Sequence, residues 1–376
     1  MAGEDLDNAR LAEPPRPPLP VEETTRDRLL ELGDRVAART WATGLREWFW
    51  GEGVCLLGLV RLARAAGRPF PPEVVGWLRE RLDRGVRVEH VNHLAPATAL
   101  ALALREIPDL RTDLEPHLRA LLDWVDQPGS ATYDDDGTLE HWPGGVWADT
   151  AFMGGLPLAH GGLVLGDDRR VAAFARQVER HVAVLQDPAT GLFVHGSHRG
   201  EVVRCFWGRA NAWCALALVE LLEVADVLGT DGVRRVGVGA QVDVARDALS
   251  RQLSALAAHQ PAHGVWSVLV DEHPETAGIV ETSAAAGLGA AVLRAQRLVD
   301  LPEGVVDAGW RAVRGALSYV DDDGTLTRTS AGTVLQLVPF GYSVVRDDRI
   351  QPWGQGLALH AVAAAVKAVD EGRGPR

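Results

Sequence analysis

The sequence has few cysteines, and they lie far apart. Cys55, Cys205 and Cys214 are odd in number, and none belongs to a Cys-x-x-Cys pair or to a Cys/His cluster with metal-ligand spacing. Neither a disulfide framework nor a zinc site is therefore expected. We interpret the three thiols as small buried apolar side chains.

Positive charge is scarce relative to negative charge. The 376 residues include 38 Lys and Arg against 51 Asp and Glu, which gives a formal net charge of −13. No basic patch stands out, so nucleic acid and anionic membrane surfaces are not expected as partners. Hydrophobic residues make up 47% of the chain, which is enough for a large core and is typical of a globular protein.

A transmembrane run and a secretory leader are also missing. No uncharged apolar run reaches the roughly 18 residues of a transmembrane helix. The first 23 residues are acidic and rich in proline, without the basic stretch and apolar stretch of a signal peptide. We therefore expect residues 1–23 to be a disordered segment, residues 24–376 to form one catalytic domain, and the protein to be cytoplasmic.

Strand signals are few, whereas helix signals run through the chain. Apolar residues recur at positions i, i+3, i+4 and i+7. This recurrence predicts helices over residues 25–41, 51–66, 71–82, 95–104, 112–125, 149–165, 168–185, 211–228, 242–258, 282–299, 303–319 and 354–369. Turn chemistry predicts short β-hairpin loops at 132–139, 187–194 and 321–326, and a further strand at 264–270.

The predicted helices alternate between two compositions. The odd-numbered ones are charged and amphipathic, as helices with one wet face are. The even-numbered ones are apolar all round and rich in small residues, as in 97–104, 283–291 and 356–365. Such helices should be buried on every side and can approach one another closely. Six repeats of this alternation predict an all-α fold, an (α/α)6 barrel of six helical hairpins with the even-numbered helices inside.

Residue types that suit a carbohydrate gather near the starts of the even-numbered helices. If these helices run parallel, their N-termini meet at one mouth of the barrel. Aromatic rings stack on the C–H faces of sugars, and amide and imidazole groups bind hydroxyls. The candidate substrate-binding residues are Trp48, Asn92, His141, Trp147, His195, Trp207, Arg209, Asn211, Trp213 and Trp353.

Each of these residues also has a purely structural interpretation. Single tryptophans commonly belong to a core. Arg209 has the planar geometry to pair with a structural carboxylate, and Glu281 has the position of a helix cap.

Asp149 is the candidate catalytic acid. It follows Trp147 by two residues and stands at the expected start of a helix. The N–H groups of a helix start favour the carboxylate anion, whereas an apolar neighbour disfavours ionisation. Capping of the helix is the structural alternative.

Two segments carry a family resemblance. Residues 146–153 (VWADTAFM) resemble the W-x-D-T-x-(F/Y)-M segment of the unsaturated uronyl hydrolases, glycoside hydrolase families 88 and 105. Residues 206–213 (FWGRANAW) resemble their W-x-R-G-N-G-W segment. The H-G and E-(T/A)-S pairs of these families match His195-Gly and Glu281-Thr-Ser, and the order fits from about Trp41 onward.

The resemblance implies an (α/α)6 barrel and a hydrolase without metal or cofactor. Its substrate would be an oligosaccharide with a Δ4,5-unsaturated uronic acid at the non-reducing end, as polysaccharide lyases produce. In these families one Asp protonates C4 of the vinyl ether while water adds at C5, and the resulting hemiketal opens and expels the remaining saccharide. Asp149 is the matching residue, and a raised pKa is expected of an acid that must first donate its proton.

The resemblance also implies roles for the surrounding residues. His195, Trp207, Arg209 and Trp213 would line the −1 subsite. Arg209 or His195 would hold the substrate carboxylate or assist the water, and Asn211 would bind hydroxyls.

The chain departs from the family pattern at several positions. Ala210 and Ala212 replace two glycines, and His195-Gly-Ser-His198 replaces H-G-W-D. A second family Asp before the fourth helix has no clear match, and Glu89, Asn92 and His93 are the local candidates.

Two other function classes stay open. One is a different (α/α)6 sugar enzyme, either a two-carboxylate glycosidase or an epimerase with His195 and His360 as bases. The other is a carbohydrate-binding toroid without catalysis.

Overall fold

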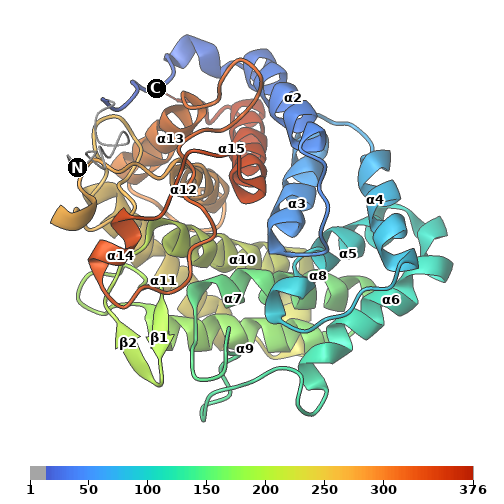
Figure 1. The fold of residues 1–376 in the computed structure, drawn as a ribbon. Coiled ribbons are helices and arrows are strands. Elements are labelled where there is room, and N and C mark those ends of the chain that lie inside the picture. The colour runs from blue at the N-terminus through green and yellow to red at the C-terminus, as the bar shows by residue number, and fades with distance from the viewer. Residues whose placement is uncertain (1–13, 376) are drawn as a thin grey trace, which may run out of the picture.

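In the described part of the chain, six helical hairpins, each an outer helix followed by an inner one, form the fold (Figure 1). The computed structural model describes residues 14–375. The outer helices are α2 (Arg26–Ala42), α4 (Pro72–Asp83), α6 (Arg111–Asp123), α9 (Asp168–Leu185), α11 (Gly239–Ala258) and α13 (Glu303–Leu317). The inner helices are α3 (Trp50–Ala65), α5 (Ala97–Glu106), α7 (Ala148–Met153) with α8 (Gly155–Leu165), α10 (Gly208–Val236), α12 (Thr282–Ala295) and α15 (Pro352–Asp370).

The inner helices form a closed ring. Helix α3 contacts α5, α5 contacts α8, and both α7 and α8 contact α10. The ring continues through α12 to α15, which returns to α3. The predicted (α/α)6 barrel is therefore confirmed.

Close approach of the inner helices explains their small residues. A Cβ on Gly58 of α3 would lie 2.6 Å from the carbonyl oxygen of Gly356 on α15. A Cβ on Gly356 would lie 2.7 Å from the backbone of Val54. The two helices therefore touch backbone to backbone, which larger side chains would prevent.

The helix predicted over 149–165 is divided in the structure into α7 and α8 at Gly154. Pro157 stands in the first turn of α8, and it has no N–H to bond the carbonyl four residues earlier in a continuous helix. Helix α10 is longer than predicted at both ends, and its chain bends at Gly229, whose φ of 64° is left-handed.

The remaining elements are short. They are η1 (Val21–Thr24), η2 (Val91–Leu94), η3 (Pro108–Leu110), η4 (Trp124–Asp126), η5 (Pro274–Thr276), α14 (Pro339–Ser343), β1 (Gly196–His198) and β2 (Glu201–Val203). The predicted hairpin loops at 132–139, 187–194 and 321–326 occur as single bridges, Tyr133 with Leu139, Gln186 with Phe193 and Val320 with Leu326. The antiparallel pair β1–β2 and helix α14 were not predicted. Within 264–270, single bridges join Ser267 to Val280 and Leu269 to Trp207.

The N-terminal segment was predicted to be disordered over residues 1–23. Residues 1–13 lie outside the described part of the chain. Residues 14–23 lie against the barrel, because the backbone N–H of Arg16 donates to the Tyr319 hydroxyl at 2.9 Å and the Leu19 N–H donates to the Arg314 carbonyl at 3.1 Å. For these ten residues the prediction of disorder is wrong.

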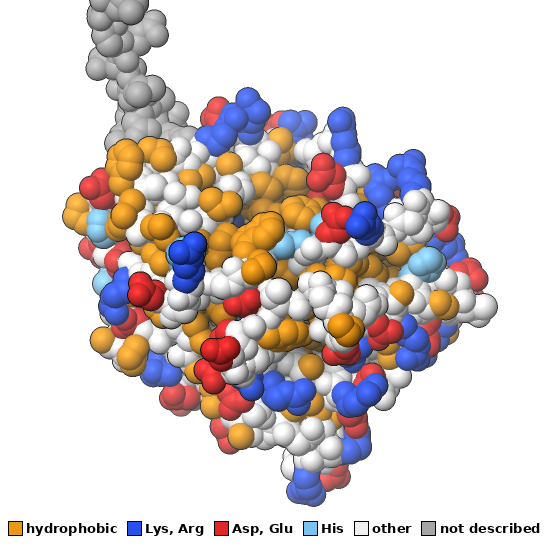
Figure 2. Space-filling view, turned by 60° about the horizontal axis from the view of Figure 1, so that its bottom comes forward, with side chains coloured by type: hydrophobic (Ala, Val, Ile, Leu, Met, Phe, Trp, Pro, Cys, Tyr) orange, Lys and Arg blue, Asp and Glu red, His pale blue; other side chains and the backbone are white. Residues whose placement is uncertain are grey.

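Over residues 14–375, no helix combines the length and apolarity that crossing a membrane requires. The three cysteines are free and buried. In the same part of the chain no three His, Cys, Asp or Glu side chains are grouped as metal ligands would be. Figure 2 shows one face of the molecule, with hydrophobic side chains gathered near its centre and most of the charged side chains toward its edge.

Candidate active site

Asp149 lies in the first turn of α7, at the mouth end of the inner helices. Trp147 holds the N-cap position with extended backbone, and no side chain caps this helix. The capping alternative for Asp149 is therefore not realised. The Asp149 side chain is 14% exposed, and its Oδ2 lies 3.5 Å from Nε2 of the buried His195.

Backbone pairing between two distant segments brings Asp149 and His195 together. The Ala148 N–H donates to the His195 carbonyl at 2.9 Å, and the Ser197 N–H donates to the Val146 carbonyl at 2.8 Å. A Cβ on Gly196 would lie 2.7 Å from the Trp147 ring, so only glycine allows this approach. The H-G pair of the sequence thus places the imidazole beside the acid.

Rings enclose Asp149 and His195. Trp147 stacks on His141 with centroids 4.5 Å apart and contacts the His195 ring at 5.3 Å. The Trp207 ring also contacts His195, with ring centroids 4.3 Å apart. His141 bonds the Thr150 hydroxyl through Nδ1 at 3.0 Å and faces the Asn92 amide through Nε2 at 3.4 Å. The structure therefore brings together six predicted site residues, which are Asn92, His141, Trp147, Asp149, His195 and Trp207.

Arg209 is fully buried and bonded to protein groups. Its Nη1 lies 3.2 Å from a Glu281 oxygen and 2.8 Å from the Ser330 hydroxyl, and its Nη2 donates to the Ala331 carbonyl at 2.9 Å. Its guanidinium lies over the Trp207 ring at 4.3 Å. The structural interpretation of Arg209 is therefore the one observed. The prediction that it holds a substrate carboxylate is not supported, because both terminal nitrogens are already occupied.

Asn211 also has a structural role. Its side-chain amide donates to the Phe193 carbonyl at 2.8 Å, and its side-chain oxygen accepts the Phe193 N–H at 2.9 Å. Gln252 donates to the same oxygen at 3.2 Å. Asn211 is fully buried, so its predicted binding of sugar hydroxyls does not fit the structure.

The other tryptophans divide into two groups. Trp353 stacks on Trp50 with centroids 4.3 Å apart, and fully buried Trp213 meets Trp50 edge-on at 6.4 Å. Trp353 also approaches Arg209, at 5.7 Å. Trp48 instead stacks on Trp77 of the outer helix α4 and donates to the His93 carbonyl at 2.8 Å. Trp48 thus belongs to a cluster separate from the rings around Asp149.

Of Glu89 and Asn92, two candidates for the position of the second family Asp, only Asn92 lies in the cluster around Asp149. It is 9% exposed, and its side-chain oxygen has no hydrogen-bond partner. Glu89 is exposed and pairs with Arg87 at 3.0 Å. A neutral amide therefore stands where the family pattern led us to look for a carboxylate.

The pKa of Asp149 differs from the prediction. Burial raises this pKa, but the His195 N–H that faces the carboxylate, the positive charges that His195 and His141 acquire when protonated at low pH, and the charge of Arg209 together hold it below its ordinary value. Burial lowers the pKa of His195, and that of His141 to about 3. Without substrate, Asp149 is therefore ionised and both imidazoles are neutral near pH 7.

Tyr342 is the site residue that sequence reasoning missed. It comes from α14 and is fully buried, and its hydroxyl lies 2.7 Å from Nδ1 of His195. The available signal was the length of chain predicted to lack regular structure between the last two helices, because long loops in compact domains are commonly functional.

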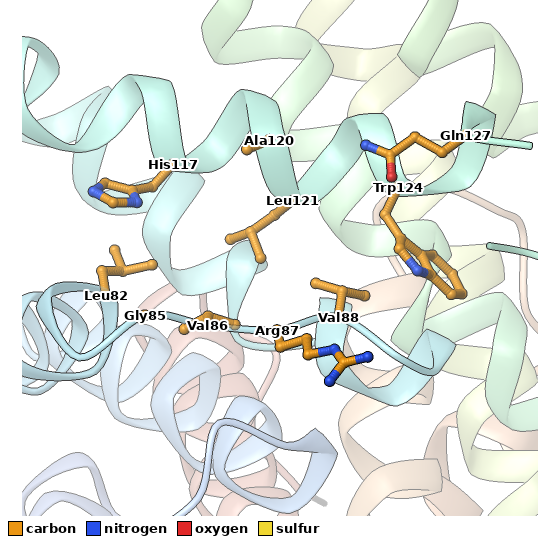
Figure 3. A pocket seen from close by; sticks show the side chains of 10 residues that line it. All are labelled: Leu82, Gly85, Val86, Arg87, Val88, His117, Ala120, Leu121, Trp124 and Gln127. Atoms are coloured by element: carbon orange, nitrogen blue, oxygen red, sulfur yellow. The ribbon is translucent and has the colours of Figure 1, made fainter.

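Two surface pockets lie beside helix α4, away from Asp149. Figure 3 shows a pocket of about 360 Å³ between the end of α4 and α6, which contains none of the predicted site residues. A neighbouring pocket of about 460 Å³ is lined by Trp48, Arg81 and His93. We therefore identify the candidate active site from the side chains that surround Asp149, and not from these two pockets.

Comparison with known proteins decides the family. The model of Glycosyl Hydrolase Family 88 matches residues 33–369. The chain belongs to this family. The resemblance noted in the sequence is thereby confirmed, and the protein is a hydrolase of glycosidic bonds.

Relatives of this family 88 hydrolase match nearly its full length. The unsaturated rhamnogalacturonyl hydrolase YesR of Bacillus subtilis is 27% identical over 354 residues, which cover 91% of this chain and 96% of YesR. The structure of a possible member of the GH105 family from Salmonella enterica superposes with a TM-score of 0.80 at 25% identity, covering 92% of this chain and 95% of the other.

A more distant structure shows the shared fold. The unsaturated glucuronyl hydrolase of Bacillus sp. GL1 has a TM-score of 0.63 at 17% identity, with 93% of this chain and 97% of the other covered.

Proposed function

We propose that the enzyme removes a Δ4,5-unsaturated uronic acid from the non-reducing end of oligosaccharides that polysaccharide lyases release. The observation that carries the proposal is the setting of Asp149. In the described part of the chain its ion pair is with an imidazole, that of His195 at 3.5 Å, and the side chains that lower its pKa are His195, His141 and Arg209. An ordinary glycosidase needs two carboxyl groups about 5 to 9.5 Å apart, whereas hydration of a vinyl ether needs one acid. The names of the relatives support the same substrate class.

In this mechanism Asp149 transfers a proton to C4 of the sugar. The double-bond electrons form the new C4–H bond, and a water oxygen bonds to C5. The water proton returns to the Asp149 carboxylate, so the acid is regenerated. The C5 hemiketal then opens and releases the remaining saccharide.

The substrate itself prepares Asp149 for this step. Asp149 is ionised in the free enzyme, as its lowered pKa indicates. The substrate carries a carboxylate at C5, next to the double bond. A second negative charge brought close to Asp149 raises its pKa and favours the protonated form that can donate.

Contacts to the sugar would come from groups that the protein leaves open. The Asn92 side-chain oxygen is buried without a hydrogen-bond partner, and Trp147 is half-buried beside it in the same cluster. Arg209 and Asn211 would not contact the sugar. Arg209 packs on the Trp207 ring, and Asn211 holds the backbone of Phe193 at the start of the 193–196 segment. The cytoplasmic location stays a prediction from the sequence.

The experiment compares wild type with Asp149→Asn on unsaturated disaccharides from pectin and glycosaminoglycan lyases. Loss of the double-bond absorbance reports turnover. Because general acid catalysis contributes about 10²- to 10⁴-fold, we expect the rate to fall by about 10²- to 10⁴-fold. Asp348→Asn, at an exposed ion pair with Arg346, is the matched control and should retain full activity. Unchanged turnover in Asp149→Asn would sink the assignment.

The epimerase alternative is less well supported by the geometry. His195 contacts Asp149 and Tyr342, whereas His360 lies in a different cluster, among Arg61, Arg294 and Glu220. A product that keeps its double bond or carries an inverted hydroxyl would favour that alternative.

A further inference from the structure

Tyr342 stands at the end of a chain of hydrogen-bonding groups that leads to Asp149. The Gln336 backbone N–H points to the Tyr342 oxygen at 3.4 Å. The Tyr342 hydroxyl and His195 Nδ1 are 2.7 Å apart, and His195 Nε2 and Asp149 Oδ2 are 3.5 Å apart. Tyr342 and His195 are both fully buried, so water does not compete for the bond between them. His195 Nε2 and Asp149 Oδ2 face each other, and neither has another hydrogen-bond partner among residues 14–375.

The first link sets the direction of the chain. A backbone N–H donates only, so the Tyr342 oxygen accepts from Gln336. The buried Tyr342 hydrogen then needs an acceptor, and His195 Nδ1 is the group at hydrogen-bond distance that offers a lone pair. Nδ1 must then be the unprotonated nitrogen, and the imidazole proton resides on Nε2. That N–H faces the Asp149 carboxylate, which only accepts.

The opposite direction leaves groups unpaired. If Nδ1 carried the proton, the Nε2 lone pair would face a lone pair of Asp149, and the Tyr342 hydrogen would have no acceptor in this chain. Burial makes such losses costly, because water cannot replace the missing partners.

The segment that carries Tyr342 is anchored in the barrel. Between α13 and α15, the carbonyls of Ser330 and Ala331 accept from the guanidinium of Arg209, and Trp353 donates to the Ser330 carbonyl at 3.1 Å. Helix α14 contacts η5, and the whole segment appears as the orange-red trace in Figure 1. Tyr342 is therefore held at a defined place on the rim.

We propose that Tyr342 is a positioning residue, which acts through His195 to keep the imidazole in the tautomer whose Nε2–H faces Asp149. This inference rests on the proposed function, in which Asp149 must be a stable, oriented anion when it accepts the proton of water. His195 supplies the N–H that stabilises that anion, and Tyr342 fixes which nitrogen carries the proton.

The direct test is the ¹⁵N spectrum of the histidine rings in the wild-type protein at pH 7. The His195 signals are assigned by their loss in His195→Gln, among the 12 histidines of the chain. We expect a pyridine-type shift at Nδ1 and a pyrrole-type shift at Nε2. The reverse pattern would overturn the proposal, and this measurement does not depend on turnover.

The functional test is Tyr342→Phe, which removes one oxygen and keeps the ring. We expect kcat to fall about 10- to 100-fold, with KM changed less than about threefold. The ¹⁵N spectrum should show both tautomers. The pH profile of kcat/KM should move to lower pH, because a free Nδ1 lets His195 become a cation that lowers the pKa of Asp149 further.

Tyr133→Phe is the matched control. The Tyr133 hydroxyl donates to the Val125 carbonyl at 2.9 Å, and the side chain is 42% exposed, so rate and spectrum should stay as in wild type. If Tyr342→Phe keeps wild-type kcat, profile and tautomer while Asp149→Asn is inactive, the positioning role is refuted and the proposed function stands. If wild type turns over no unsaturated sugar, the function fails, and the tautomer measurement still decides the placement of the proton.

Discussion

Replacement of Glu281 by alanine tests the buried ion pair that supports the site. Glu281 and Arg209 are both fully buried. The Glu281 carboxylate also accepts the Ser283 N–H and the Ser330 N–H, each at 3.1 Å. Its removal takes away the carboxylate that is paired directly with the buried Arg209 guanidinium. Breaking a buried pair from one side costs about 3 to 5 kcal/mol.

This cost converts into a melting temperature. The entropy of unfolding is about 2.1 cal/mol/K per residue, which amounts to about 0.8 kcal/mol/K for a chain of this length. A loss of about 4 kcal/mol therefore lowers Tm by about 5 °C, measured by scanning calorimetry. Since Ser330 belongs to the segment that carries Tyr342, turnover should fall as well.

The control removes an exposed pair on the same segment. Asp348 pairs with Arg346 at 2.8 Å, with side chains 65% and 40% exposed. Such pairs contribute at most about 1 kcal/mol, so Asp348→Asn should shift Tm by no more than about 1 °C. If Glu281→Ala melted as close to wild type as this control does, Arg209 would not depend on Glu281, and the reasoning would be refuted.

Two further predictions concern pH and Asn211. Because the pKa of Asp149 in the free enzyme is below its ordinary value and only the protonated acid donates, kcat/KM should decrease as pH rises through the neutral range. The pH above which kcat falls should be higher than the corresponding pH for kcat/KM, since bound substrate raises the pKa of Asp149. A pH series on one unsaturated disaccharide measures kcat and kcat/KM. A kcat/KM that stays constant between about pH 5 and 8 would contradict the mechanism. Asn211→Ala should cost about 2 to 3 kcal/mol, because the buried N–H and carbonyl of Phe193 lose their partners, and calorimetry should show a Tm lower by about 3 °C. An unchanged Tm with a raised KM would instead restore the hydroxyl-binding role.

The fold was predictable because its signal is local. A helix that is buried on all sides must be apolar on all sides, and this property can be read from a short stretch such as 97–104. Six repetitions of that property fix the architecture. The break between α7 and α8 was missed because Pro157 falls within a run that otherwise keeps the helical apolar pattern.

The site was predictable in part. The aromatic and imidazole groups around Asp149 gather as the helix starts implied. The sequence does not show which side chains bond to one another in the folded protein. Arg209, for example, is bonded to Glu281 and Ser330, which lie 72 and 121 positions away along the chain. The sign of the Asp149 pKa shift depends on the same information, because neighbouring positive charges compete with burial. Tyr342 has no local pattern that distinguishes it from a loop residue.

The residues that depart from the family pattern do not contact the candidate catalytic groups directly. A Cβ on Gly287 of α12 would come within 2.9 Å of the Ala212 Cβ, so the extra methyl of Ala212 packs against a glycine in the helix interface. Ser197 uses its hydroxyl to accept the Val146 N–H at 3.2 Å and thereby supports the pairing that holds Asp149 beside His195. His198 is exposed at the end of β1. None of these contacts involves Asp149, His195 or Tyr342 directly. The substitutions relative to the family motif therefore leave the arrangement of these three residues, which the proposed chemistry requires, unchanged.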